Sequence, residues 1–125
     1  QEADVTVPDS VVKIGVQAFC GCKSLRRVFL PDTVKYIEDF AFKGCTSLQH
    51  IQFSASLRGI GSCAFLNCKS LKEIVIPDSV IEMEDCCFSN CRNLTAIYLP
   101  FKEDQINMNW FKNCPLLKQE NIYLY

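Results

Sequence analysis

The sequence predicts a β-rich solenoid, because one pattern of residues recurs along the chain at a fixed step of 23. Each copy has a phenylalanine, a cysteine three residues later and a leucine three residues after that. These columns are Phe19, Phe42, Phe65, Phe88 and Phe111; Cys22, Cys45, Cys68, Cys91 and Cys114; and Leu25, Leu48, Leu71, Leu94 and Leu117. A short apolar triplet then follows, as in Val28-Phe29-Leu30 and Ile74-Val75-Ile76. Such columns indicate a stack of similar coils, each covered by its neighbours.

Residues 28–50 show how one coil is expected to fold. Val28 and Leu30 alternate with Phe29, which predicts a three-residue strand with Val28 and Leu30 inward and Phe29 outward. Pro31 ends this strand, because proline has no N–H for the ladder. The other inward positions of the coil are Val34, Ile37, Phe42, Cys45 and Leu48.

The step of 23 with the L-x-x-[IV]-x-[LIF] pattern is typical of leucine-rich repeats. We therefore expect a solenoid with parallel inner strands and short turns or irregular outer segments. It should form a single domain over residues 1–125, with repeats from about 5, 28, 51, 74 and 97.

The last repeat departs from the pattern. Phe101, Glu103 and Trp110 replace Asp, Val and Ala at their columns, and the triplet Ile122-Tyr123-Leu124 comes two residues late. The chain then stops directly after this apolar strand. This ending indicates either an excerpt from a longer array or an end that pairs with another molecule, as in end-to-end self-association.

Composition excludes two classes of partner. With 13 basic and 14 acidic residues the net charge is -1, which gives no electrostatic reason to bind nucleic acid. No apolar run approaches the roughly 20 residues that a membrane-spanning helix needs, so we expect no membrane insertion.

The nine cysteines are interpreted mainly as buried, reduced packing residues, because five of them fill one repeat column. A Cys63–Cys86 disulfide stays open, since both residues share a column on adjacent coils. A zinc site of Cys63, Cys86, Cys87 and Cys91 is disfavoured, because no paired C-x-x-C is present. Calcium at Asp9, Asp32 and Asp78 is also disfavoured, since one carboxylate per coil suits a turn better. We expect neither a metal nor a cofactor.

The outward positions of the inner strands are the candidate binding residues, because packing does not dictate their identity. Exposed aromatic rings beside arginine are typical of interaction hot spots. The candidates are Arg27, Phe29, His50, Gln52, Glu73, Val75 and Tyr98. No catalytic residue is assigned: His50 is the only histidine, and the column cysteines should point into the core.

The columns "[IV]-x-[IL]-P-[DS]-[ST]-V-x-x-I-x-x-x-A-F-x-x-C-x-x-L" resemble the BspA-like leucine-rich repeats of host-associated bacteria and some protists. The resemblance covers residues 5–100 strongly and 101–124 weakly. It implies a curved solenoid and a surface or secreted protein with an adhesion-type role. It supplies no catalytic motif and no fixed set of partner-binding residues.

These observations favour a non-enzymatic module that binds a protein or glycan partner through its concave strand face. Two alternatives stay open: a structural spacer or stalk that displays other domains, and a thiol-dependent enzyme. The resemblance implies a surface or secreted location, whereas the reduced-thiol interpretation leaves an intracellular one open.

Overall fold

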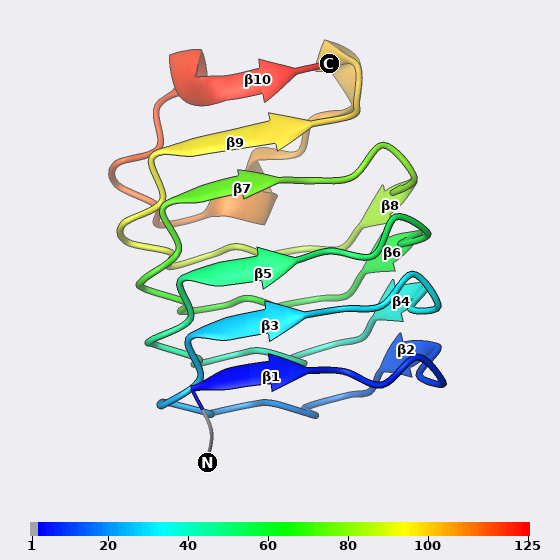
Figure 1. Cartoon of the computed structure of the whole chain (residues 1–125). Helices are drawn as coiled ribbons and strands as arrows, with labels where there is room; N and C mark the ends of the chain where they lie inside the picture. Colours follow the sequence, from blue (N-terminus) through cyan, green and yellow to red (C-terminus); the bar gives the residue numbers. More distant parts are fainter. Residues whose placement is uncertain (1–2) are drawn as a thin grey trace.

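The computed structural model describes residues 3–125 as a stack of coils, with a column of long strands on one side and short strands on the other (Figure 1). The long strands of the described chain are β1 (Asp4–Thr6), β3 (Arg27–Phe29), β5 (His50–Gln52), β7 (Glu73–Val75), β9 (Ala96–Leu99) and β10 (Ile122–Leu124). The short strands are β2 (Lys13–Ile14), β4 (Tyr36–Ile37), β6 (Gly59–Ile60) and β8 (Glu82–Met83). This architecture confirms the predicted leucine-rich-repeat solenoid with parallel strands.

All strand pairs are parallel, and their register follows the repeat. Val28 pairs with Ile51, and Ile37 pairs with Ile60, a step of 23 residues in each case. In the last coil Ile122 pairs with Ile97, so this step is 122 − 97 = 25 residues. The two extra residues that delay the last triplet therefore lie within the last coil, and the strands still pair in register.

The phenylalanine column forms a ladder of rings through the centre of the stack. Phe19, Phe42, Phe65 and Phe88 stack with successive centroids 5.1 Å apart and nearly parallel planes. Phe111 continues the ladder at 6.5 Å and 25°. Parallel rings at this spacing pack each coil against the next, so the core is a continuous ribbon.

A tight turn precedes each column cysteine and requires the left-handed backbone region. Gly21 and Gly44 lie there with φ of 74°, which glycine adopts without a Cβ clash. The later coils use asparagine, which tolerates this region better than most residues. These positions are Asn67, Asn90 and Asn113.

Two residues of the first coil correct the sequence prediction. Phe19 and Cys22 were expected to be buried, but both are only half-buried. Within the described residues they are covered by one neighbouring coil, whereas Phe42 and Cys45 lie between two. Burial in a solenoid depends on the neighbouring coils and not on the column alone.

The long strands do not form one continuous sheet, contrary to the expected pairing of all inner strands. Among the described residues β1-β3-β5 and β10-β9-β7 form separate sheets, whereas β2-β4-β6-β8 is unbroken. Figure 1 shows the wider separation between β5 and β7. The stack therefore opens at one step on the long-strand side only.

Phe53 lines this opening and departs from the other residues of its column. Other coils place a buried aliphatic residue at its column, and the half-buried ring of Phe53 packs edge-on against Phe65 with centroids 6.0 Å apart. Those aliphatic residues are Val7, Leu30, Ile76 and Leu99. Phe53 is thus aromatic where the other coils are aliphatic, at the one step of the described stack where the long strands are unpaired.

The turn after Phe53 uses serine chemistry in place of Pro-Asp-Ser. Ser54 is fully buried, and its Oγ accepts the Ser56 N–H at 3.0 Å. The Ala55 N–H donates to Asp32 Oδ1 of the preceding coil, also at 3.0 Å. These bonds replace the conformational restriction that proline supplies elsewhere.

The outer part of the last coil contains three short 3₁₀ helices: η1 (Glu103–Gln105), η2 (Met108–Phe111) and η3 (Gln119–Asn121). Trp110 in η2 is buried, and its Nε1–H donates to the Met83 carbonyl at 3.1 Å. Its ring also packs against Phe101 with centroids 5.6 Å apart. The residues that break the repeat columns thus cover the coil beneath them.

Candidate functional site

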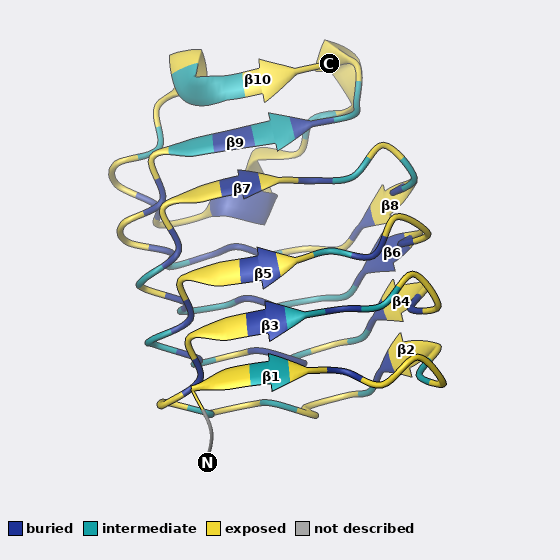
Figure 2. Ribbon diagram, in the orientation of Figure 1, coloured by how far each residue is buried: buried dark blue, intermediate teal, exposed yellow. Residues whose placement is uncertain are grey.

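The long-strand face is the surface formed by the outward side chains of β1, β3, β5, β7, β9 and β10. Strands β1, β3, β5 and β7 each have a more buried centre, and Figure 2 shows β5 and β7 with a buried centre between exposed ends. Val28, Ile51 and Ile74 occupy such centres. The flanking positions are free of packing and can vary without disturbing the core.

The structure arranges the sequence-predicted residues of this face in two adjacent rows. One row follows the first position of each strand and the other follows the third, with neighbours in direct strand register except at the step from β5 to β7. The first row is Asp4, Arg27, His50, Glu73 and Ala96; the second is Thr6, Phe29, Gln52, Val75 and Tyr98. All seven predicted candidates therefore lie on one surface.

Arg27 is paired within this surface. Its Nε donates to Asp4 Oδ1 at 3.0 Å and its second nitrogen to Asp4 Oδ2 at 2.8 Å. This bidentate geometry fixes the guanidinium plane. Arg27 therefore presents an already paired guanidinium to a partner.

Aromatic rings occur at two places in the second row, at Phe29 and at its last member, Tyr98. Phe29 lies 6.0 Å from the His50 ring, and Tyr98 stacks on Tyr123 at 4.8 Å between centroids. Tyr123 was not among the predicted candidates, because its two-residue delay takes it out of the 23-residue column. The signal that could have identified it is the apolar triplet Ile122-Tyr123-Leu124, which places tyrosine at the outward position.

A groove of about 460 Å³ runs between β5 and β7 on the long-strand face. Three predicted residues, His50, Glu73 and Val75, line it. The other lining residues are Ile51, Phe53, Ile74 and Pro77. Sequence reasoning missed the groove, because the columns predict an equal spacing of all coils.

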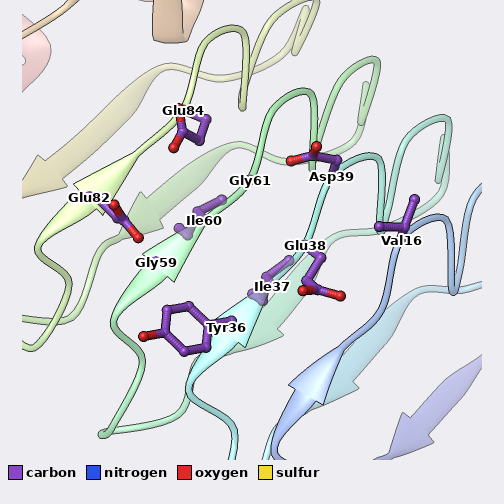
Figure 3. Close-up of a pocket in the computed structure, with 10 residues that line it drawn as sticks. All are labelled: Val16, Tyr36, Ile37, Glu38, Asp39, Gly59, Ile60, Gly61, Glu82 and Glu84. Carbon is purple, nitrogen blue, oxygen red and sulfur yellow. The ribbon is translucent and has the colours of Figure 1, made fainter.

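A second hollow, of about 190 Å³, lies on the short-strand side (Figure 3). Gly59 and Gly61 leave it open, and a Cβ on Gly61 would lie 2.6 Å from the Asp39 backbone nitrogen. Its carboxylates are Glu38, Asp39, Glu82 and Glu84. Across residues 3–125 no group of three or more His, Cys, Asp or Glu side chains is arranged to hold a metal ion.

The column cysteines have a defined role in joining the coils. Four of the five column thiols donate to the carbonyl of the phenylalanine 26 residues earlier, as Cys68 does to Phe42 at 3.2 Å. The other pairs are Cys45 to Phe19, Cys91 to Phe65 and Cys114 to Phe88. All nine cysteines are free thiols, including Cys63 and Cys86, which do not form the disulfide left open by the sequence.

Burial suppresses ionisation of these thiols. It raises the pKa of Cys45 to about 12 and also raises the pKa of Cys68 and, outside the column, Cys87. A buried neutral thiol is a poor nucleophile, because the thiolate is the reactive form. Cys45 and Cys68 therefore serve packing, whereas the pKa of Cys114 in the last coil is lowered by its hydrogen bond with the Cys91 thiol.

We expect Cys45 and Cys68 to react with iodoacetamide at least about 1,000-fold more slowly than exposed Cys20 in the native protein, because each step of one in pKa makes the thiolate about tenfold scarcer and burial blocks access. Pulsed alkylation with mass spectrometry, in native buffer and in denaturant, measures these rates. Equal labelling of Cys20 and Cys68 would contradict the packing role.

Because the folded thiol pKa of Cys45 lies above the unfolded value, the free energy of unfolding should fall as pH rises from about 8.5 toward 12.

Sequence comparison adds a family to this geometry. Residues 2–118 match the family described as BspA type leucine rich repeat region, in six copies. This chain belongs to that family. The match agrees with the resemblance seen in the sequence, and it extends across most of the irregular last repeat.

Solved structures share the fold. A leucine rich cell surface protein from Faecalibacterium prausnitzii A2-165 is 33% identical with a TM-score of 0.92, over 99% of this chain and 32% of that protein. A leucine rich repeat protein of T. pallidum is 30% identical with a TM-score of 0.71, over 98% of this chain and 68% of that one. The pneumococcal vaccine antigen PcpA has a TM-score of 0.88 at 20% identity, over 98% of this chain and 30% of that chain, and shows the fold alone.

The chain thus spans about one third of the F. prausnitzii protein. No curated protein matches the sequence significantly. Within residues 3–125 the structure contains no helix of the length and apolar character needed to span a bilayer.

Proposed function

We propose that this chain is a non-enzymatic interaction module that binds a protein or glycan partner through the long-strand face. The observation that carries the proposal is the contrast between two sets of positions on the same strands. The inward residues are uniformly aliphatic, whereas the outward rows change chemistry at every coil and include Phe29 and the Tyr98–Tyr123 stack. Phe29 and Tyr98 are half-buried and Tyr123 is exposed, and such aromatic rings on a surface are well suited to partner binding.

The family supports this function and a cell-surface location. The F. prausnitzii relative is described as a cell surface protein. The fold is a leucine-rich-repeat scaffold, and burial raises the pKa of the column thiols Cys45 and Cys68. The interaction module is therefore favoured over a thiol-dependent enzyme, and adhesion is the proposed context.

We expect Phe29→Ala and Tyr98→Ala each to weaken partner binding by about 1–4 kcal/mol, which is about 5-fold to nearly 1,000-fold in Kd. Both rings point away from the core, so stability should change little. The partner is first identified with the intact domain, against host surface proteins and a glycan array. Binding of each variant is then measured by calorimetry.

Lys13→Ala and Lys43→Ala serve as matched controls away from the long-strand face. Lys13 lies on β2 in the short-strand sheet, and Lys43 lies above the Phe40 ring. Equal losses in controls and face variants would move the interaction off this surface. Retention of binding by all four variants would show that neither aromatic ring contributes and would place the interaction on other residues.

We also propose end-to-end self-association through the exposed side chains of β10, which include Tyr123 and Leu124. Sedimentation velocity over a concentration series tests it. A single monomeric species at every concentration would rule it out.

A further inference from the structure

The groove between β5 and β7 separates two strands that each have one paired and one unpaired edge. On its paired edge β5 meets β3, where the Leu30 N–H donates to the Gln52 carbonyl at 3.0 Å. On its paired edge β7 meets β9, where the Ile76 N–H donates to the Tyr98 carbonyl at 2.9 Å. In the described chain no backbone hydrogen bond joins β5 to β7.

The unpaired groups can be identified from the neighbouring coils. In the first step of the stack the Val7 N–H donates to the Phe29 carbonyl at 3.0 Å. The equivalent bond here would run from the Phe53 N–H to the Val75 carbonyl. A continued ladder would also use the main-chain groups of Ile51 and Glu73. These four residues direct their main-chain N–H and C=O groups into the groove from both sides, because successive residues of a strand point to opposite edges.

Unpaired strand edges are templates for further pairing, so a ligand with regularly alternating donors and acceptors would match this groove. The opening is confined to one side, because Gly59 and Glu82 stay paired in the short-strand sheet behind it. Its volume of about 460 Å³ lies within the range of ordinary ligand pockets, roughly 300–1,000 Å³.

We propose that the groove binds an extended peptide segment of a protein partner, whose main chain pairs with the free edges of β5 and β7. An extended peptide offers N–H and C=O groups at the spacing of a strand, which is the basis of recognition by strand addition. Phe53 and Val75 supply apolar contacts for alternate peptide side chains, and His50 and Glu73 place one basic and one acidic group at the mouth. This inference rests on the proposed function, since it specifies the partner chemistry of the same face.

The first measurement is amide exchange of the ¹⁵N-labelled protein by NMR. The amides of Ile51, Phe53, Glu73 and Val75 should exchange at least about tenfold faster than those of Leu30 and Tyr98, which are paired in neighbouring ladders. Exchange as slow as at Leu30 and Tyr98 would mean that the two strands pair in solution, and the proposal would fall.

The second measurement adds the blocked peptide Ac-Thr-Val-Thr-Val-Thr-NH₂, and a pool of blocked pentapeptides randomised at all five positions, at about 1 mM. We expect chemical-shift changes and slower exchange at the same four amides. The pool with every internal peptide nitrogen methylated is the control, because it keeps the side chains but loses the donors. Absence of these changes with both probes, or equal binding of the methylated pool, would overturn the proposal.

Phe53→Leu is the matched variant, since leucine occupies this column in two other coils as Leu30 and Leu99. It should close the groove, protect the four amides without peptide and weaken peptide binding at least about tenfold. Unchanged peptide affinity in this variant would contradict the site. The methylated pool acts on the wild-type protein, so that arm does not depend on how the variant folds.

Two further arms separate this inference from the function on which it rests. The first arm adds maltohexaose. If it shifts the NMR signals of the four amides and the peptides do not, the ligand of the groove is a glycan and the proposal is overturned. If the peptides fail while Phe29→Ala and Tyr98→Ala still weaken partner binding, the face binds but the groove does not. If the peptides bind in the groove but those two substitutions have no effect on partner binding, the groove proposal stands and the role of Phe29 and Tyr98 is rejected.

Discussion

Phe65→Ala should destabilise the protein by about 3–5 kcal/mol, the usual cost of deleting a fully buried phenylalanine ring. Phe65 lies at the centre of the ladder, stacked 5.1 Å from both Phe42 and Phe88 and edge-on to Phe53. The substitution leaves a cavity where this coil meets the preceding coil and the following coil. In a solenoid such a loss weakens two successive interfaces, because each coil is held mainly by its neighbours.

Thermal and urea unfolding followed by circular dichroism measure this effect. A loss of this size corresponds to a fall in Tm on the order of 10–20 °C for a domain of this length. Phe29→Ala is the matched control, since it removes the same ring from the long-strand face and should cost less than about 1 kcal/mol. An unchanged Tm for Phe65→Ala would show that the phenylalanine column does not hold the coils together.

Trp110→Ala should cost a similar amount, about 3–5 kcal/mol, although Trp110 lies outside the repeat pattern. The indole is 6% exposed and packs against Phe101 and, at 89°, against Phe111. Its Nε1–H also satisfies the Met83 carbonyl of the short-strand sheet. Removing the indole exposes the contact between the last coil and the coil before it. The Met83 carbonyl then loses its hydrogen-bond donor.

Trp110→Phe separates packing from hydrogen bonding, because it keeps a large ring but removes the donor. It should cost about 1–3 kcal/mol, the range for an unsatisfied buried polar group. Urea unfolding of both variants by circular dichroism gives the two free energies. If both variants were as stable as the wild type, the irregular last coil would not contribute to the stability of the stack.

The repeat columns were sufficient to predict the fold because each column corresponds to one packing position. Val28, Ile51 and Ile74 are buried as predicted, as are Phe42, Phe65 and Phe88. Strand register follows from the same step of 23, since one residue of slippage would turn the inward residues outward. The outward rows could also be assigned, because strand alternation places Phe29 and Gln52 opposite the core side.

Periodicity could not predict features that depend on differences between coils. The 23-residue pattern treats Phe53 as one more apolar residue, although its ring is larger than Leu30 or Ile76 and lines the opening between β5 and β7. It also omits Tyr123, which reaches the Tyr98 stack only because the last coil absorbs two extra residues. The burial of Phe19 differs from that of Phe42 for a related reason, because it depends on how many coils cover the ring.

By itself the sequence determined the solenoid, the parallel register, the inward columns and the surface on which partner-binding residues lie. These properties are local to one coil and repeat with it, so a single chain reveals them. Only the tertiary structure decided the groove, the Arg27–Asp4 pair and the hydrogen bond from Trp110 to Met83. Each of these depends on the distance between particular side chains of stacked coils, which is set by their size and packing and not by the period of the repeat.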